Sequence, residues 1–440
     1  MTVTPSQPAL GSRAAAGSQA APEQLTAIPQ TMRAVVLRGA SEAHLALEQV
    51  PVPRPSCRQL LARVDAAGIC TSLLKLISQG REHPYLYGWD LSSYPLILGD
   101  EGSVTLVEVG ADLRGRYQVG ERYVVQPAVD HAPINHLERY ANHGRGVHKI
   151  AVGYTLPGHL AEYMLIPEEV IEASCLVSVT DDTAYSHASL AEPLSCVVSA
   201  QAHHVRVEQD SPLTARVAAS GLKSGGLVVV IGAGAMGRMH VDIALSRSPR
   251  AVVVVDVLQE RLELCKQLFA SRASSRSIAF HTLLSKDDLN EQLRAISERG
   301  ADDVIVAVAV PKAIQDAQTL VARGGVLNLF GGLKRQDAQL ALDTTKIHYD
   351  EIIITGSSGG TAWDLAESLA LMQQGTIDAS AHITRIADLA HAKTLLEQVR
   401  NQDIDGKAIV YPHRPTARIH QVDRWTATDE QQYLNKSGAS

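Results

Sequence analysis

Long hydrophobic runs and cysteines are both scarce in this chain of 440 residues. The longest apolar runs, such as 304–310, fall far short of the roughly 18 residues that a membrane-spanning helix needs, and the N-terminus lacks the charged start and apolar block of a signal peptide. We therefore expect no membrane segment. The five cysteines are scattered and odd in number, unlike a disulfide framework, so we expect reduced thiols in the cytoplasm.

An excess of positive charge is absent as well. The chain has 40 Lys and Arg residues against 47 Asp and Glu residues, for a net charge of -7. Because there is no basic arm or stripe, we do not expect nucleic acid as a partner. The composition, 45% hydrophobic and 20% charged, is ordinary for a globular protein. The length exceeds one ordinary core, so we expect two domains plus tails.

The composition of the sequence and the spacing of its apolar residues change along its length. Residues 1–31 are rich in Ala, Ser, Pro, Gln and Gly, which predicts a disordered extension. Short β-runs separated by turn residues follow and predict a β-rich first domain over 32–196. From about residue 226, apolar strand-like runs alternate with helical stretches, which is typical of a parallel sheet covered on both faces. We therefore expect a doubly wound domain over 197–345.

The rest of the chain is expected to complete the first domain. Residues 346–412 contain strand-like runs at 351–355 and 407–411 and are predicted to return to it. The fold class is then α/β, with the doubly wound domain inserted into a β-rich one. The polar stretch 413–440 is expected to be a loose tail, although Trp425 and Tyr433 could dock.

A glycine-rich turn opens the doubly wound domain. The segment Gly232-Ala233-Gly234-Ala235-Met236-Gly237 directly follows an apolar run and begins a helical stretch. Gly232 permits the tight turn, Gly234 lets the backbone approach a pyrophosphate, and Gly237 packs helix against strand. The helix N-terminus at Ala235 and Met236 offers free N–H groups. Asp256 ends the next strand, where an acid binds ribose hydroxyls and repels a 2'-phosphate, so NAD is the predicted cofactor; helix capping is the alternative role for Asp256.

Three further segments carry candidate metal ligands. They are Gly68-Ile69-Cys70-Thr71-Ser72, Leu98-Gly99-Asp100-Glu101-Gly102 and Ala191-Glu192-Pro193-Leu194-Ser195. From about Met32 to Pro412 the chain resembles the medium-chain zinc-dependent alcohol and polyol dehydrogenases, in which G-I-C-G-S-D, G-H-E and E-P-L-S supply the metal site. The resemblance implies a GroES-like β-rich catalytic domain with an inserted Rossmann domain. It also adds Arg261, shortly after Asp256, to the cofactor-binding residues.

The resemblance further implies one catalytic zinc and a proton relay. The expected zinc ligands are Cys70, Asp100, Glu101 and Glu192. Glu101 is either a direct ligand or one that exchanges with water. Zinc with an open position lowers the pKa of a substrate hydroxyl before hydride passes to the nicotinamide. Ser72 is expected to pass the hydroxyl proton outward, and Lys75 either finishes the relay or binds an anionic substrate group. The ordinary structural alternatives are a buried thiol, acids that cap or ion-pair, and a solvated lysine.

Two positions depart from the family pattern. Asp100 stands where the pattern has a zinc histidine, and Leu73 stands where it has an aspartate three residues after the cysteine. We interpret these changes as linked, because a metal-bound histidine needs an acceptor for its second N–H, whereas an aspartate ligand has no such proton.

The structural zinc site of many relatives is absent, because the segment 127–160 contains no cysteine. This segment holds His131, His136, His143, His148 and His159. Scattered loop histidines are more often surface residues than ligands, so we expect no second metal there.

Within the family, the pattern is most similar to the L-sorbose-1-phosphate reductase and sorbitol dehydrogenase branch. The segments that carry this likeness are 209–226, 324–332 and 348–361. The branch implies reversible oxidation of a secondary alcohol in a polyol, sugar phosphate or cyclitol by a homo-oligomer. Two alternatives stay open: a metal-free medium-chain reductase of activated double bonds, and a catalytically decayed nucleotide-binding protein, which the departures at Asp100 and Leu73 would suit.

Overall fold

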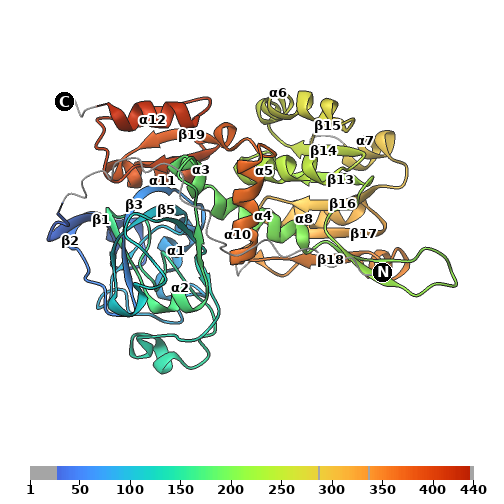
Figure 1. Ribbon diagram of the computed structural model, residues 1–440. Coiled ribbons are helices and arrows are strands. Elements are labelled where there is room, and N and C mark those ends of the chain that lie inside the picture. The colour runs from blue at the N-terminus through green and yellow to red at the C-terminus, as the bar shows by residue number, and fades with distance from the viewer. Residues whose placement is uncertain (1–26, 286–287, 335–336, 437–440) are drawn as a thin grey trace.

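The structure of the chain is a computed structural model that describes residues 27–285, 288–334 and 337–436. Two parts lie side by side (Figure 1), a β-rich part and a part built on a parallel sheet. The β-rich part takes strands from both ends of the described chain, and the parallel sheet comes from the middle. The predicted α/β fold with an inserted doubly wound domain is confirmed.

The β-rich part is organised around a sheet with the order β10-β6-β5-β3-β20-β19-β21, in which β9 also pairs with β3. Its strands are β3 (Leu60–Gly68), β5 (Gly102–Val109), β6 (Arg122–Val125), β9 (Tyr163–Ile166), β10 (Leu176–Ser178), β19 (Ile383–Ala387), β20 (Lys407–Val410) and β21 (His420–Gln421). Smaller sheets join β2 (Leu45–Pro51), β1 (Thr31–Leu37) and β4 (Leu96–Ile97), and β7 (Ala128–Val129) with β8 (Ile150–Ala151). Antiparallel pairing sets Ile409 of β20 opposite Gly68 of β3, which brings the late strand next to the end of the early one.

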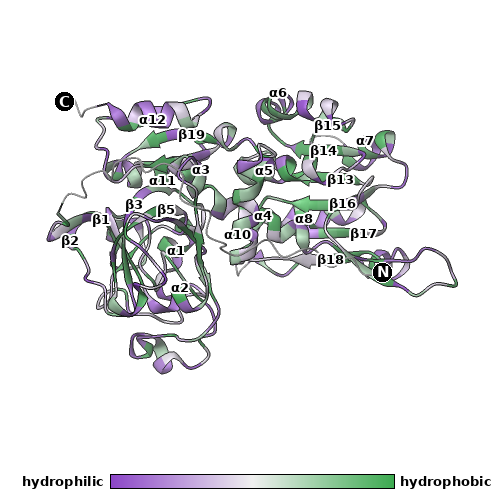
Figure 2. Cartoon of the chain, viewed as in Figure 1, coloured by the Kyte–Doolittle hydropathy of each residue, from purple (hydrophilic) through white to green (hydrophobic). Residues whose placement is uncertain are grey.

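The second part is a six-stranded parallel sheet in the order β15-β14-β13-β16-β17-β18. Its elements are β13 (Leu227–Ile231), α5 (Ala235–Ala244), β14 (Ala251–Asp256), α6 (Gln259–Ser275), β15 (Ala279–Leu284), α7 (Leu289–Ile296), β16 (Ala301–Val306), α8 (Pro311–Ala317), β17 (Val321–Leu329), α9 (Thr344–Tyr349) and β18 (Ile353–Gly356). The inner strands are continuous apolar runs because helices cover both faces of the sheet. They stand out as hydrophobic in Figure 2. The strand order reverses beside β13, which is where doubly wound sheets bind nucleotides.

Helices connect and cover the two parts. Besides those of the parallel sheet, they are α1 (Ser72–Gln79), α2 (Glu168–Glu172), α3 (Tyr185–Ser189), α4 (Ala191–Ala202), α10 (Ala362–Gln373), α11 (Ala392–Asn401) and α12 (Ala427–Asn435). Helices α4, α5 and α10 lie between the two sheets in Figure 1. Leu194 of α4 and Met239 and Ile243 of α5 belong to one apolar core with Ile409 of β20, so packing joins the parts. A hairpin of β11 (Val205–Glu208) and β12 (Val217–Ser220) precedes β13.

Two expectations about the C-terminal third are wrong. The strand-like run near 351–355 was expected to return to the β-rich domain, but β18 pairs with β17 and forms the edge of the parallel sheet. The tail after 412 was expected to be loose, but β21 pairs with β19 and α12 packs against the body, where Trp425 and Glu430 are buried. The two aromatic side chains of this tail join the core that α4 shares with α5, which explains why a polar segment docks.

The expected disordered extension falls mostly outside the described residues. Of the predicted disordered extension, residues 1–26 lie outside them, and 27–30 lead directly into β1. None of the helices in the described part of the chain is both long and apolar enough to cross a membrane.

Candidate active site

The candidate metal ligands come from three elements that meet at one end of the β-rich sheet. Cys70 follows β3, and the Asp100-Glu101 pair directly precedes β5, the neighbour of β3. The Gly68 N–H donates to the Glu101 carbonyl at 3.1 Å, which fixes the two segments against each other. Glu192 lies in the first turn of α4. The sheet and α4 therefore hold the candidate residues on rigid elements.

Three of the four candidate ligands form a compact cluster. One ligand atom each from Cys70, Asp100 and Glu101 lies within 4.8 Å of the other two. Glu192 lies beside this cluster rather than in it, and its Oε1 accepts a hydrogen bond from the Cys196 thiol at 3.4 Å. The structure thus brings the segments around Cys70 and Asp100 together as the motifs predicted.

The cluster carries more negative charge than its surroundings can accommodate. Burial, followed by the charges of Asp100 and Glu101, raises the pKa of the Cys70 thiol well above its usual value. Burial and the Glu101 carboxylate raise the pKa of Asp100 to about 6. The pKa of Glu192 is raised as well, mainly by burial and then by the charge of Asp100. Such a set of desolvated acids either takes up protons or is compensated by a cation.

Two unpartnered oxygens test whether a metal cation fits. Asp100 Oδ1 and Glu101 Oε2 are buried without a hydrogen-bond partner among the described residues. Buried carboxylate oxygens are normally paired or bound to a metal. A thiol with carboxylate oxygens is a donor set that zinc accepts. The cluster therefore fits a zinc ion.

A buried lysine that the sequence did not point to supports Glu101. The Lys407 ammonium, on β20, donates to Glu101 Oε1 and is almost fully buried. Burial lowers the pKa of Lys407, but the charges of Glu101 and Cys70 raise it by more. This ammonium therefore stays charged. The bare α-carbon of Gly68 makes room for Glu101, because a Cβ there would lie 2.1 Å from Glu101 Oε2. A lysine at the start of a buried strand was the only signal of this role in the sequence.

Ser72 lies against the candidate ligands. Its hydroxyl donates to Asp100 Oδ2 at 2.6 Å, and its N–H donates to Cys70 Sγ at 3.5 Å. Leu73, by contrast, is buried in the apolar core. The polar partner of Asp100 is thus residue 72, one position before the residue where the family pattern has its aspartate.

A tyrosine that sequence reasoning missed lines the same place. Tyr154 is almost fully buried, and burial followed by the Asp100 and Cys70 charges raises its pKa, while a hydrogen bond with Ser72 opposes the shift. Its ring contacts those of His83 and Tyr85, with centroids 5.2 and 5.9 Å away. Nothing in the loop sequence around 154 marked it.

Lys75 points across to the nucleotide-binding part. Its ammonium donates to the Gly332 carbonyl at 3.0 Å, beyond the end of β17. It is near enough to His83 to contribute, after burial, to lowering the pKa of His83 to about 4. The side chain therefore lies where the two parts are in contact.

The glycine-rich turn has the geometry that its sequence predicted. Gly232 has a φ of +105°, and a Cβ on Gly237 would lie 1.7 Å from the Gly232 carbonyl oxygen. A Cβ on Gly234 would meet nothing within 4 Å, so this face of the turn is open. Helix α5 begins at Ala235, and Met236 follows in its first turn. The turn therefore leaves room for a pyrophosphate at a helix N-terminus.

Asp256 ends β14 beside this turn. Its carboxylate accepts hydrogen bonds from Ala233 N at 2.7 Å and from Leu258 N at 2.9 Å. Arg261, in α6, lies 3.8 Å from Asp405, and the same carboxylate also pairs with the buried Arg238 at 2.7 Å. A loop just before β20 thus reaches the cofactor-binding part.

One of the five loop histidines is not at the surface. His131, His136, His143 and His148 are exposed, as expected. His159 is instead fully buried, and its Nδ1 lies 3.1 Å from the Gly99 carbonyl oxygen, next to Asp100. Burial lowers the pKa of His159 to about 4, so the ring is neutral. The expectation of a surface residue is wrong for His159, because it packs against Gly102.

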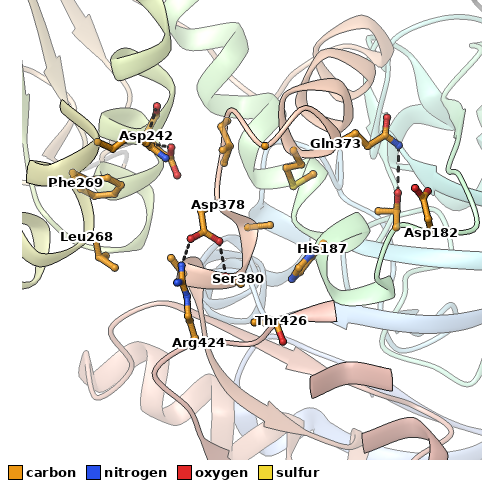
Figure 3. Close-up of a pocket in the computed structure, with 17 residues that line it drawn as sticks. Asp182, His187, Asp242, Leu268, Phe269, Gln373, Asp378, Ser380, Arg424 and Thr426 are labelled. Atoms are coloured by element: carbon orange, nitrogen blue, oxygen red, sulfur yellow. Dashed lines mark hydrogen bonds and ion pairs between the residues drawn. The ribbon is translucent and has the colours of Figure 1, made fainter. Parts of the chain in front are cut away.

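A separate cavity of about 660 Å³ lies between the two parts, away from the metal cluster. Figure 3 shows Asp242 and Phe269 on one side and Asp378 and Arg424 on the other. Its main charged groups are already paired, Asp378 with Arg424 and Asp242 with Arg272. None of the predicted metal or cofactor residues lines it.

Comparison with known proteins gives the family. The model of the alcohol dehydrogenase GroES-like domain matches residues 56–174, and that of the zinc-binding dehydrogenases matches residues 235–374. A mannitol-1-phosphate 5-dehydrogenase from Aliivibrio fischeri is 30% identical over 87% of each chain. The chain belongs to the zinc-binding dehydrogenase family. An L-sorbose 1-phosphate reductase from Klebsiella pneumoniae is 29% identical over 84% of this chain and 85% of its own.

A solved structure shares the fold of this zinc-binding dehydrogenase. The 2R,3R-butanediol dehydrogenase from Bacillus subtilis superposes with a TM-score of 0.68 at 20% identity, covering 87% of this chain and all of its own. The predicted GroES-like and Rossmann domains are thus confirmed, and so are the family and the prediction of a dehydrogenase that uses zinc and a nicotinamide dinucleotide.

Proposed function

We propose that this enzyme interconverts a secondary alcohol and a ketone in a polyol or sugar phosphate, with NAD as the hydride carrier. The observation that carries the proposal is the pair of unpartnered buried oxygens on Asp100 and Glu101, within 4.8 Å of the Cys70 thiol. The substrate class is supported by the two relatives named for sugar-phosphate substrates. A metal-free reductase has no use for this acid cluster.

Cys70, Asp100 and Glu101 would hold the zinc ion, with Glu192 able to replace or join Glu101. Bound there, zinc supplies a Lewis acid that lowers the pKa of a substrate hydroxyl. The Ser72 hydroxyl, held at 2.6 Å by Asp100, can turn to accept the hydroxyl proton of a substrate and pass it on. The Lys407 ammonium offsets one carboxylate charge, and Tyr154 closes one side against water.

A substrate screen tests the reaction. Polyols, sugar phosphates and cyclitols are offered with NAD, and the absorbance of reduced nicotinamide is followed. Cys70→Ala should abolish turnover and Glu192→Ala should lower it, while both variants keep NAD binding nearly intact, since metal and nucleotide are bound by different parts. Elemental analysis should give about one zinc per chain. Full turnover by zinc-free enzyme would refute the proposal.

The preference for NAD rests on Asp256. Because its carboxylate ends β14 beside the glycine-rich turn, a 2'-phosphate would meet a negative charge there. Asp256→Ala should weaken NAD binding and narrow the difference from NADP. Tighter binding of NADP than NAD by the wild-type enzyme would overturn this choice. We further propose a cytoplasmic homo-oligomer; the five cysteines of the described structure are all unpaired, which suits a reducing compartment.

A further inference from the structure

Two lysines of the β-rich part reach across to the same edge of the parallel sheet. Lys75 donates to the Gly332 carbonyl at 3.0 Å, and Lys149 donates to the Ser358 carbonyl at 3.2 Å. Gly332 follows β17 and Ser358 follows β18, which are neighbouring parallel strands. Both ammonium groups therefore lie beyond the carboxyl ends of the strands, where doubly wound domains bind their ligands.

An aromatic pair connects Lys149 to the metal cluster. The Lys149 ammonium lies 5.6 Å from the centre of the Tyr85 ring, and the Tyr85 ring packs edge-on against Tyr154 with centroids 5.9 Å apart. Tyr154 in turn hydrogen-bonds Ser72 beside the cluster. The Tyr85 hydroxyl also lies 2.9 Å from the Ser358 hydroxyl. One wall of side chains thus runs from the acids to Lys149.

The charges at the two ends of this wall are opposite. The metal cluster holds the carboxylates of Asp100 and Glu101, whereas the far end holds an ammonium and two hydroxyls. Within the described residues, Lys149 forms no ion pair, and only one of its N–H groups is engaged with a carbonyl. A lysine ammonium has three donors, so the others are available to an anion.

The phosphates of the nucleotide are too far away to be this anion. The pyrophosphate belongs at the glycine-rich turn after β13, and β18 stands three strand positions from β13. Because strands are spaced about 4.8 Å apart, the two sites are separated by roughly 14 Å. An anion bound at Lys149 would therefore come from another molecule.

We propose that Lys149, with the hydroxyls of Tyr85 and Ser358, binds the phosphate group of a phosphorylated polyol whose reacting hydroxyl lies at the Cys70-Asp100-Glu101 cluster. This inference rests on the proposed function and assigns the enzyme to sugar phosphates rather than free polyols. Charge and hydroxyl donors together are what phosphate recognition requires.

The test compares each hexitol 1-phosphate with the free hexitol on the zinc-loaded enzyme with NAD. The wild type should favour the phosphorylated partner in kcat/KM. Lys149→Gln should lower that preference by roughly 10- to 100-fold, mostly through KM, because a hydrogen bond to a charged group is lost. Ser358→Ala and Tyr85→Phe should lower it less, and both keep the carbonyl and ring that Lys149 contacts. Lys312→Gln, which removes an exposed lysine paired with Asp316 on α8, serves as the matched control and should change nothing.

The outcomes separate this inference from the proposed function. Equal kcat/KM for both partners in the wild type, or an unchanged preference in Lys149→Gln, overturns the phosphate site and leaves the dehydrogenase intact. If no polyol is oxidised at all, the proposed function fails, and calorimetric titration of inorganic phosphate into the zinc- and NAD-loaded enzyme then decides. Binding that Lys149→Gln weakens and Lys312→Gln does not supports the site; no binding, or equal binding, overturns it.

Discussion

Asp100→Asn should stabilise the zinc-free enzyme, and zinc should remove most of that extra stability. Without metal, the buried Asp100 carboxylate lies beside Glu101, and its pKa is raised to about 6 from a usual value near 3.8. At 1.36 kcal/mol per pKa unit, its ionisation in the folded protein is unfavourable by about 3 kcal/mol at pH 7. A neutral amide of the same size removes this term, so the zinc-free variant should be more stable than wild type by up to that amount.

Zinc removes most of this difference in stability. At a free zinc concentration 100 times the wild-type Kd, binding stabilises the wild type by about 2.7 kcal/mol. A variant with a 100-fold larger Kd gains only about 0.4 kcal/mol from the same zinc. An amide oxygen is a poorer zinc ligand than a carboxylate, so we expect at least this loss.

Urea unfolding of chelator-treated and of zinc-reconstituted protein measures the free energy of unfolding without and with zinc. The sign of the pH dependence provides a second check. Because the folded pKa of Asp100 is raised, its unfavourable term is present above pH 6 and fades as pH falls toward 4. The extra stability of zinc-free Asp100→Asn over the zinc-free wild type should decrease over the same pH range. If the variant instead binds zinc as wild type does, Asp100 is a structural acid and our ligand assignment is wrong.

Three further substitutions test neighbouring parts of the argument. Gly68→Ala should displace Glu101 and weaken zinc binding by ~10-fold or more. The control variant Gly115→Ala, in which the new Cβ meets no other atom within 4 Å, should bind zinc as the wild type does. Equal zinc affinities of the two variants, measured by competition with a chelator, would contradict this prediction. Gly234→Ala should leave Tm unchanged and weaken NAD, because its Cβ meets no protein atom but enters the space for the pyrophosphate; unaltered NAD titrations would show that the turn is not the binding site. His159→Asn should reduce the fall in the free energy of unfolding between pH 6.5 and 4. The buried neutral ring contributes up to about 3 kcal/mol to this fall, because the unfolded state takes up a proton that the folded state does not. An unchanged pH profile in urea unfolding would contradict this explanation.

Local sequence patterns predicted the parallel sheet but not its edge. The inner strands are continuous valine-rich runs, which only a sheet covered on both faces explains. The run at 353–356 is short and half-buried, and nothing local distinguishes a partner in one sheet from a partner in the other. Parallel pairing with β17 is a tertiary outcome. The docked tail escaped prediction for a similar reason, since a few anchors such as Trp425 outweigh a polar composition.

At the candidate site, the motif residues were predictable and their partners were not. Cys70, Asp100 and Glu101 lie on segments whose spacing marks them, and the structure brings them together. Lys407 stands 306 positions from Glu101, so its role appears only when β20 pairs with β3. Ser72 was expected to handle a proton, but its hydrogen bond to the Asp100 carboxylate could not be derived from sequence spacing.

The late position of Lys407 has a consequence for biosynthesis. Chains fold from the N-terminus as they leave the ribosome, so Cys70, Asp100 and Glu101 emerge long before the ammonium that offsets their charge. The last helix completes the arrangement, because the Glu430 carboxylate accepts N–H groups of Tyr185 and Ser186 at the start of α3, which leads into the helix of Glu192. A nascent chain that has not yet reached β20 therefore presents an acidic, thiol-containing patch without the Lys407 counter-charge. The charge balance of this site is therefore reached only after β20 has been synthesised and has paired with β3.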